Sequence, residues 1–244
     1  MYADDILLIS ASVNGLQKLL DTCFLYCVDV GLSLNAKKSN CVSIGGCGKM
    51  KISNMTIGMQ EIEWSSSLKY LGVLFDVGKH LKVNCSEIRR KFYAAFNAVL
   101  YKCKHFNESL QLYLIQVYCL PLLMYCMNVL MVNQNDLREI SVCWNDAFRR
   151  IYGLNRWESA APVQFFTSNL SFEHMYNLHT WNFIDEVRTE YNIAVPEPVK
   201  FVYNVRKFEH NLVTSFADKY KFYGTSKRGK RTAIFTVFGN ELEL

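Results

Sequence analysis

The chain opens with Met1-Tyr2-Ala3-Asp4-Asp5-Ile6-Leu7-Leu8-Ile9, in which two adjacent carboxylates follow an aromatic and a small residue. Successive side chains of a strand point to opposite faces, so Asp4 and Asp5 can share a metal ion only if the chain turns tightly there. We therefore expect a tight turn at the pair, with Ile6–Ile9 as a buried strand that leaves it. Two such carboxylates repel each other unless cations lie between them. A two-metal phosphoryl-transfer site is built in this way, with Mg²⁺ ions about 3.5–4 Å apart.

Tyr2-Ala3-Asp4-Asp5 followed by aliphatic residues resembles the catalytic hairpin of reverse transcriptases, specifically those of non-LTR (LINE-type) retrotransposons. Two later segments extend the resemblance. A predicted helix ends in Gly31-Leu32-x-x-Asn35-x-x-Lys38-Ser39, and Lys69-Tyr70-Leu71-Gly72-Val73 follows about thirty residues later. In order and spacing these segments are similar to the later palm motifs of that family. An Asp pair in a surface turn is common by itself, so the order of the three segments carries the resemblance.

The resemblance implies roles for individual residues. Asp4 and Asp5 would hold Mg²⁺, and Lys38 would complete the catalytic set beside the triphosphate of the incoming nucleotide, since a lysine is a mobile point charge suited to phosphate. The residues that would contact the primer are Tyr2, Tyr70, Leu71 and Gly72. The implied partners are an RNA template, a DNA primer and a dNTP. If the resemblance is set aside, the sequence predicts that Lys38 is a solvent-exposed loop lysine and that Tyr70–Gly72 belongs to an ordinary strand.

Local signals place the elements between these motifs. Ser12 is a candidate N-cap for a helix from Val13 to about Val30, and Gly31 supplies its left-handed stop. Cys41–Ile44 alternates in polarity and predicts a strand. Leu68–Phe75 reads as a further strand, in which the glycine indicates a bulge or a close backbone approach.

We expect a domain boundary at 78–84. The chain then consists of a partial reverse transcriptase palm (1–78), a helical thumb-like region (79–157) and a helical C-terminal region of unknown role (158–244). Asn84, with Glu87 three residues later, predicts a capping-box-like helix start. The apolar positions of 137–151 define an amphipathic helix that Gly153 closes, and a further helix is expected from Ser171 to about Tyr191.

Positive charge is concentrated in the middle of the chain. Lys and Arg outnumber Asp and Glu by 11 to 5 over 77–157, against 6 to 7 over 1–76 and 10 to 10 over 158–244. A local basic surface predicts a polyanionic partner, although such a run is also typical of a solvated helix face. The candidate nucleic-acid contacts are Arg89, Arg90, Lys91, Lys102, Lys104, Arg149 and Arg150.

Residues 109–135 carry no charge, and their length is enough to cross a membrane. Gln111, Gln116, Pro121 and Asn128 interrupt the segment, which favours a central helix of a bundle with apolar residues on every side. Within it, 118–125 resembles a stretch with tyrosines and a proline that lies in the helical thumb of LINE-type enzymes. A helical membrane protein anchored by 109–132 remains an alternative.

Nine cysteines lack the spacing of a zinc site, which predicts buried thiols in a reducing compartment, cytoplasm or nucleus. The opening residues are acidic and the apolar run after them is short, so no secretory signal is predicted. The basic run 226–231 suits contact with nucleic acid, a nuclear address or a solvated tail.

The expected fold is α+β: a partial polymerase palm, with a small antiparallel sheet and a helix, followed by a mostly helical thumb-like region. The expected function is that of a fragment of an RNA-directed DNA polymerase. Fingers and a third carboxylate on an earlier strand are not found in this sequence, so we expect no polymerisation by this chain alone. A second hypothesis is that the chain is a remnant that binds nucleic acid without catalysing a reaction.

Overall fold

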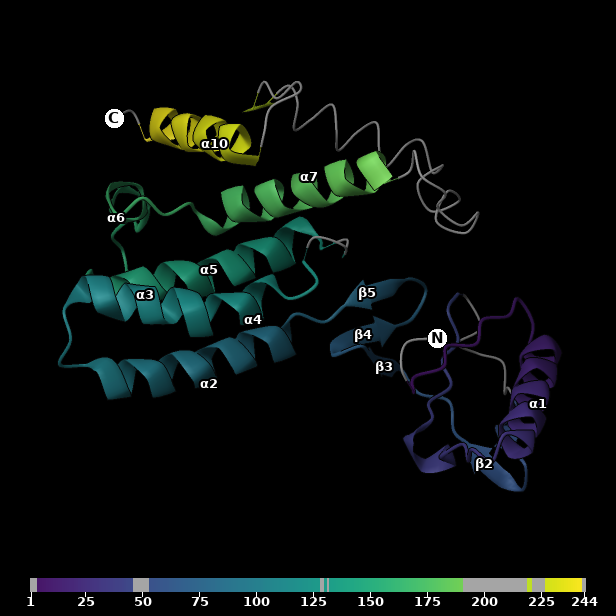
Figure 1. Cartoon of the computed structure of the whole chain (residues 1–244). Coiled ribbons are helices and arrows are strands. Elements are labelled where there is room, and N and C mark those ends of the chain that lie inside the picture. The colour runs from purple at the N-terminus through teal and green to yellow at the C-terminus, as the bar shows by residue number, and fades with distance from the viewer. Residues whose placement is uncertain are drawn as a thin grey trace. The chain divides into compact units, whose positions relative to one another are not determined.

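The computed structural model describes residues 4–45, 53–127, 130, 132–190, 219–220 and 227–242. The chain divides into two compact units, which we call unit 1 (Met1–Asn84) and unit 2 (Cys85–Leu244). Within the described residues, every strand belongs to unit 1 and unit 2 is helical (Figure 1). The expected α+β class is confirmed.

Helix α1 (Val13–Asp29) forms the helical part of unit 1, as predicted. The Ser12 side chain accepts the backbone N–H of the residue three positions later at 3.1 Å, which satisfies one of the free amides at the helix start. Gly31, at φ 73°, reverses the chain, and the Leu32 amide then donates to the Cys27 carbonyl at 2.7 Å. Both predicted helix ends are confirmed.

Five short strands form two antiparallel sheets in unit 1: β1 (Met55–Ile57) with β2 (Gln60–Ile62), and β3 (Ser67–Tyr70), β4 (Val73–Val77) and β5 (Leu81–Val83) in that order. Helix α1 packs on β1, and a short 3₁₀ helix, η1 (Ala36–Lys38), packs on β2. The buried residues of this first core are Leu20, Ala36, Cys41, Met55, Ile57 and Ile62.

The expectation of one strand over Leu68–Phe75 is wrong, because Leu71 and Gly72 form a two-residue turn between β3 and β4. Tyr70 pairs with Val73 across this turn. Leu71 has φ 47° and Gly72 has φ 80°, and two central residues with positive φ make the turn that matches the twist of a hairpin. The glycine therefore serves a chain reversal and not a bulge.

The predicted strand Cys41–Ile44 is reduced to an isolated parallel bridge between Cys41 and Trp64. The Ser65 amide donates to the Cys41 carbonyl at 2.7 Å, and the Gly45 amide donates to the Gly78 carbonyl at 3.0 Å. The backbone of 41–45 thus contacts segments that flank the three-stranded sheet without forming a strand of it.

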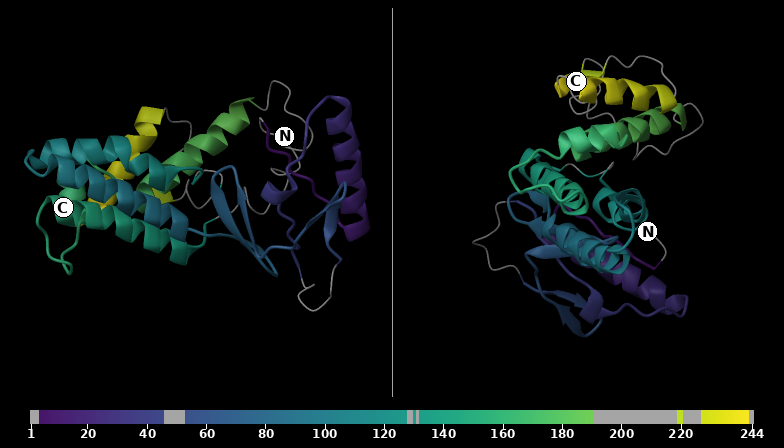
Figure 2. Two further views of the ribbon diagram at one scale, coloured as in Figure 1. Left: turned by 90° about the horizontal axis from the view of Figure 1, so that it is seen from below. Right: turned by 90° about the vertical axis from the view of Figure 1, so that its left-hand side faces the viewer.

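Unit 2 consists of α2 (Ser86–Cys103), α3 (Glu108–Tyr118), α4 (Leu120–Met124), α5 (Gln134–Ile151), α6 (Ala161–Phe166), α7 (Phe172–Glu190) and α10 (Lys227–Glu241). Helix α5 packs on α2, α7 packs on α5, and α10 packs on α7, so the helices form successive layers (Figures 1 and 2). The predicted helices at 137–151 and from Ser171 are confirmed.

Helices α2 and α5 run parallel. Three side-chain contacts give the direction: Arg89 with Glu139, Tyr93 with Asp146, and Asn97 with Arg150. The partner numbers rise together along both helices. Fully buried aromatic and aliphatic side chains of the two helices contribute to the core of unit 2: Phe92, Phe96, Ile140, Trp144 and Phe148. This core includes the apolar face that the sequence predicted for α5.

Three further expectations for unit 2 are wrong. Asn84 does not cap α2, whose N-cap is Cys85, because its side-chain amide instead donates to the Asp76 carboxylate at 2.9 Å. The segment 109–135 does not form one helix buried on every side. Helix α3 ends at Tyr118, Pro121 opens the short α4, and Tyr113 is 59 % exposed. Of the three alternatives for the basic run 226–231, the solvated tail is wrong for 227–231, which forms the start of α10.

Candidate metal and nucleic-acid site

Asp4 lies in a turn, as predicted, and the side chains of both Asp4 and Asp5 are exposed. The segment that follows is not a buried strand. Ile6 and Leu7 are partly exposed, and Ile9 is 79 % exposed, because 6–10 lies outside both sheets of unit 1. Only Leu8 of the apolar run packs against the core of unit 1. The aspartates are therefore presented on the surface by a segment with one apolar anchor.

Lys38 ends the 3₁₀ helix η1, and its side chain is exposed. Its backbone amide donates to the Asn35 side chain at 3.3 Å and to the Asn35 carbonyl at 3.1 Å, so the Asn-x-x-Lys spacing makes a capped turn. Ala36, two residues earlier, is buried in the same core that Leu8 contacts. The segments that carry the Asp pair and Lys38 are thus anchored in one hydrophobic cluster.

Tyr70, Leu71 and Gly72 form the tip of the β3–β4 hairpin, in a different sheet from the one that packs on α1. Tyr70 is half-buried and Leu71 is partly exposed. Tyr2 lies outside the described residues. The candidate primer residues that are described therefore share one turn, with backbone exposed by a glycine.

The basic residues predicted to contact nucleic acid divide into two groups. Arg89 forms an ion pair with Glu139, and Lys91 pairs with Glu87 at 3.3 Å. Arg90, Lys102 and Lys104 are exposed. Lys104 Nζ lies 5.5 Å from the centre of the Tyr101 ring. Of these residues, Arg90, Lys102 and Lys104 are therefore the better candidates for contact with nucleic acid, because Arg89 and Lys91 are in ion pairs within the chain.

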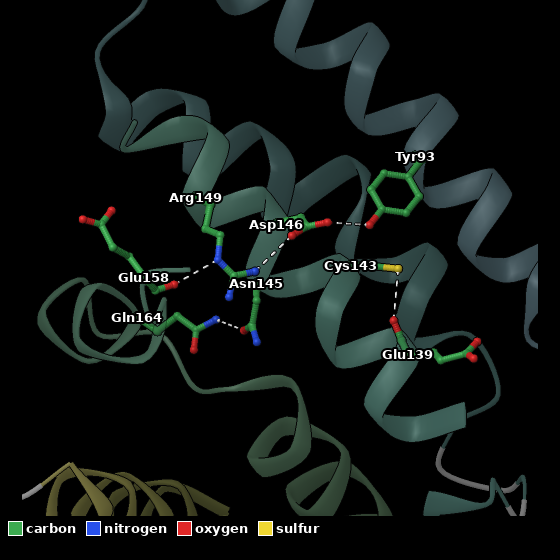
Figure 3. Close-up of polar contacts among 8 residues, drawn as sticks. All are labelled: Tyr93, Glu139, Cys143, Asn145, Asp146, Arg149, Glu158 and Gln164. Atoms are coloured by element: carbon green, nitrogen blue, oxygen red, sulfur yellow. Dashed lines mark hydrogen bonds and ion pairs between the residues drawn. The ribbon is translucent and has the colours of Figure 1, made fainter. Parts of the chain in front are cut away.

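Arg149 and Arg150, both near the end of α5, are held by unit 2 itself. Arg149 donates to the Asp146 carboxylate at 3.0 Å and through Nε to the Glu158 carbonyl at 3.0 Å (Figure 3). Arg150 donates to Asn97 at 2.7 Å, and its guanidinium lies 4.8 Å from the centre of a phenylalanine ring of α2. Arg150 is nevertheless exposed, whereas the Arg149 side chain is only 20 % exposed.

A polar network between α2 and α5 has no counterpart in the predictions. The Tyr93 hydroxyl donates to Asp146 at 2.9 Å, and Cys143 donates to the Glu139 carbonyl at 3.4 Å (Figure 3). Burial raises the pKa of Tyr93, and its hydrogen bond to the Asp146 carboxylate adds to the rise. Tyr93 and Asp146 are 53 residues apart, so no local pattern reveals their contact.

Carboxylate oxygens are the ligands that Mg²⁺ prefers, and Asp4 and Asp5 are of the right chemical type. Among the described residues, however, no three His, Cys, Asp or Glu side chains lie close enough together to hold a metal ion. The described part of the chain thus supplies two carboxylates and not a complete two-metal site.

Residues 1–75 match the family described as "Reverse transcriptase (RNA-dependent DNA polymerase)". No curated protein and no solved structure matches the chain significantly. The match contains the Asp pair, Lys38 and the tip of the β3–β4 hairpin, so this part of the chain is a reverse-transcriptase-like segment. Reverse transcriptases use divalent metal ions and act on a nucleic-acid template with dNTPs. Within the described residues, no helix has the length and apolar character needed to cross a lipid bilayer.

Proposed function

We propose that this chain is a fragment of an RNA-directed DNA polymerase of the LINE type, in which the first 78 residues are part of the palm and unit 2 begins with a thumb-like region. The observation that carries the proposal is the family match over residues 1–75, because it contains all three motifs in order. The turn at Asp4 supports it, since a turn is needed for neighbouring carboxylates to approach one cation.

In this proposal Asp4 and Asp5 bind Mg²⁺, which neutralises charge that develops during phosphoryl transfer when a complete site is present. Lys38 lies beside the triphosphate of the incoming nucleotide, and its exposed ammonium group supports that role. The tip of the β3–β4 hairpin contacts the primer end, where Gly72 allows a close backbone approach. Tyr2 completes the primer contact. The partners are an RNA template, a DNA primer and a dNTP.

The chain does not polymerise DNA by itself in this proposal. Two exposed carboxylates compete with water for the cation, and Mg²⁺ keeps several of its own waters when it has only one or two protein ligands. Phosphoryl transfer depends almost entirely on positioning and charge stabilisation, so a loosely held ion contributes little rate. A primer-extension assay on an RNA template with Mg²⁺ is expected to show no product, and clear extension would contradict this part of the proposal.

Metal binding tests the proposal directly. Mn²⁺ is a paramagnetic substitute for Mg²⁺, and we expect it to broaden the amide NMR signals of residues around Asp4 and Asp5. The double substitution Asp4→Asn, Asp5→Asn should abolish this broadening. Asp29→Asn, which alters another exposed carboxylate of unit 1, is the matched control and should not. Equal broadening in the double variant would exclude a metal site at the pair.

A second candidate, a nucleic-acid-binding remnant without chemistry, is favoured by the exposed Arg90, Lys102 and Lys104 of α2 and the turn that follows it. Binding to an RNA–DNA hybrid should weaken steeply as salt rises, because each neutralised phosphate releases counterions. Salt-dependent binding combined with the absence of a metal effect at Asp4 and Asp5 would support the remnant over the polymerase fragment.

A further inference from the structure

One end of unit 2 brings together side chains that are distant in the sequence. Since α2 and α5 run parallel with partners 50 to 53 residues apart, their C-terminal ends lie at the same end of the helical layers (Figure 1). Tyr101 and Lys104 follow Asn97 by one to two helical turns, and the loop 152–160 follows Arg150, so both segments lie at this end of unit 2. Burial raises the pKa of Tyr152, and the Glu108 carboxylate at the start of α3 adds to the rise, so α3 begins nearby.

Two aromatic rings at this end are almost fully exposed. Trp157 is 88 % exposed and Tyr101 is 76 % exposed. Each ring has a cation beside it: the Arg156 guanidinium lies 5.9 Å from the centre of the Trp157 ring, and Lys104 Nζ lies 5.5 Å from the centre of the Tyr101 ring. Stacking on a flat ligand would remove much of this ring area from water, which makes the two rings candidate ligand contacts.

The loop that carries Trp157 is anchored at both ends. The Leu154 amide donates to the Arg149 carbonyl at 2.9 Å, and Arg149 Nε donates to the Glu158 carbonyl at 3.0 Å (Figure 3). The Glu158 carboxylate also accepts the Asn155 amide. Because these contacts fix the backbone on either side of Trp157, the ring is presented with little loss of backbone entropy when a ligand binds.

The charge at this end is positive. The exposed cations are Lys102, Lys104, Arg150 and Arg156, against the carboxylates of Glu108 and Glu158. The Glu158 carboxylate is already used by the loop, and Arg149 is neutralised by Asp146. A polyanion is therefore attracted to the same place at which the two rings are exposed.

We propose that the surface formed by Tyr101, Lys104, Arg150, Arg156 and Trp157, which we call the aromatic end, binds unpaired nucleotides of single-stranded nucleic acid. The two rings stack on bases, and the three cations contact the phosphates between them. The proposal rests on the proposed function, since it assumes that the chain binds nucleic acid. A duplex offers its bases only at the helix ends, so exposed rings favour a single strand. An acidic peptide would satisfy the charges but offers no face for both rings.

Tryptophan fluorescence gives a direct test. Of the four tryptophans in the chain, Trp144 and Trp181 are buried and Trp64 is half-buried, whereas Trp157 is exposed. Titration of the full chain with an oligo(U) strand of about 12 nucleotides, within the usual site size, should quench the Trp157 emission as a base stacks on it. Trp157→Phe should keep most of the affinity, measured with a labelled strand, while removing the quenching.

Trp157→Ala and Tyr101→Ala should each weaken oligo(U) binding about 5- to 150-fold, the range for loss of one stacked base. Tyr118→Ala removes another exposed ring of unit 2, at the far end of α3, and should leave the affinity unchanged. Arg156→Glu should weaken binding and reduce its salt dependence, whereas Arg138→Glu, at the other end of α5, should do neither.

The outcomes separate this proposal from the one on which it rests. If the parent chain binds oligo(U) in a salt-dependent way but Trp157→Ala and Tyr101→Ala bind equally well, the aromatic end is excluded while nucleic-acid binding stands. If the parent chain binds neither oligo(U) nor an RNA–DNA hybrid at low salt, both proposals fail. Unchanged Trp157 emission at saturating oligo(U), or preference for a duplex or an acidic peptide, would also overturn the stacking site.

Discussion

Unit 1 and unit 2 differ in where their apolar side chains lie. In the first core of unit 1 the aromatic residues Phe24 and Trp64 are only partly buried, and the large residues Tyr26, Leu25 and Leu32 around the end of α1 are more than 60 % exposed. In unit 2 the side chains of Phe92, Phe96, Trp144 and Phe148 are completely buried. The family match over residues 1–75 lies within unit 1, the less tightly packed of the two units.

The difference shows that the candidate catalytic residues lie in the unit that buries its large apolar side chains less completely. Unit 1 presents Asp4, Asp5 and Lys38 on its surface, from segments anchored in the core by few apolar residues. We therefore expect unit 2 to be the more stable unit, and each of the following experiments tests that ranking.

The largest effect is expected from Trp144→Ala in unit 2. The Trp144 side chain is fully buried, and its indole N–H donates to the Leu170 carbonyl at 3.2 Å. Its removal leaves a cavity and should lower the free energy of unfolding by about 3–5 kcal/mol. Urea denaturation followed by circular dichroism measures the loss. Val142→Ala, at a half-exposed position on the same helix, is the control. Similar unfolding midpoints for both variants would show that this core does not stabilise unit 2.

Alkaline pH should destabilise unit 2. Burial raises the pKa of both the Cys85 and the Cys119 thiols to about 11, from an ordinary value near 9.0. Unfolding lets these thiols ionise at the lower pH, so the stabilisation is fully present below about pH 9 and is lost as pH rises through about 11. Two pKa units correspond to about 3 kcal/mol for each thiol once the loss is complete.

Denaturation at several pH values between 8 and 11 measures the loss of unfolding free energy at alkaline pH. A shift of one pKa unit corresponds to about 1.4 kcal/mol. A Cys85→Ala, Cys119→Ala variant should show a shallower decline than the parent chain, whatever its stability at pH 8. An identical decline would mean that other groups cause the loss.

The polar network of α2 and α5 should have the next largest effect. Asp146 accepts hydrogen bonds from Tyr93 and Arg149, and a hydrogen bond to a charged group contributes about 1.5–3 kcal/mol. Asp146→Ala should therefore destabilise unit 2 by about that amount, and Tyr93→Phe by less. The double variant should lose less than the sum of the two, because they share one contact. Additive losses would show that the Tyr93–Asp146 bond is not formed in solution.

The smallest effect concerns unit 1. Gly31 has φ 73°, with open space where a Cβ would lie, so Gly31→Ala should cost about 1 kcal/mol from backbone strain alone. Gly78→Ala also meets open space but does not have a positive φ, and should cost little. Hydrogen exchange of α1 measures both. Faster exchange of α1 in Gly31→Ala, with α5 unchanged, would support the lower stability of unit 1.

Local signals in the sequence were sufficient where one residue decides the outcome. Ser12 and Gly31 set the ends of α1, and the apolar spacing of 137–151 fixed the buried face of α5. The local signals failed where a residue could adopt either of two local structures. Asn84 has the spacing of a helix cap, but β4 and β5 bring Asp76 within its reach. Leu71 is not a typical turn residue, so the pattern around Gly72 predicted a continuous strand instead of a hairpin.

The candidate site was predictable as a set of motifs and not as an arrangement. Asp4, Lys38 and Gly72 stand in a recognisable order, but the core that joins the segments of Asp4 and Lys38 depends on Leu8 and Ala36, which have no distinctive pattern. The partner of Arg89 was equally hidden, since Glu139 lies 50 residues away on a neighbouring helix, whereas Asp146 stands three residues before Arg149 on the same helix and could be read from the spacing.

The parallel arrangement of α2 and α5 has a consequence for how the chain folds. Parallel helices cannot be joined by a tight turn, so the contacts of α2 with α5 close loops of 50 residues or more, whereas α2 meets α3 through a short hairpin. Folding slows as contacts become more distant in sequence. During synthesis, α2 therefore meets α3 and α4 first and remains without its α5 partner until residue 150 has left the ribosome.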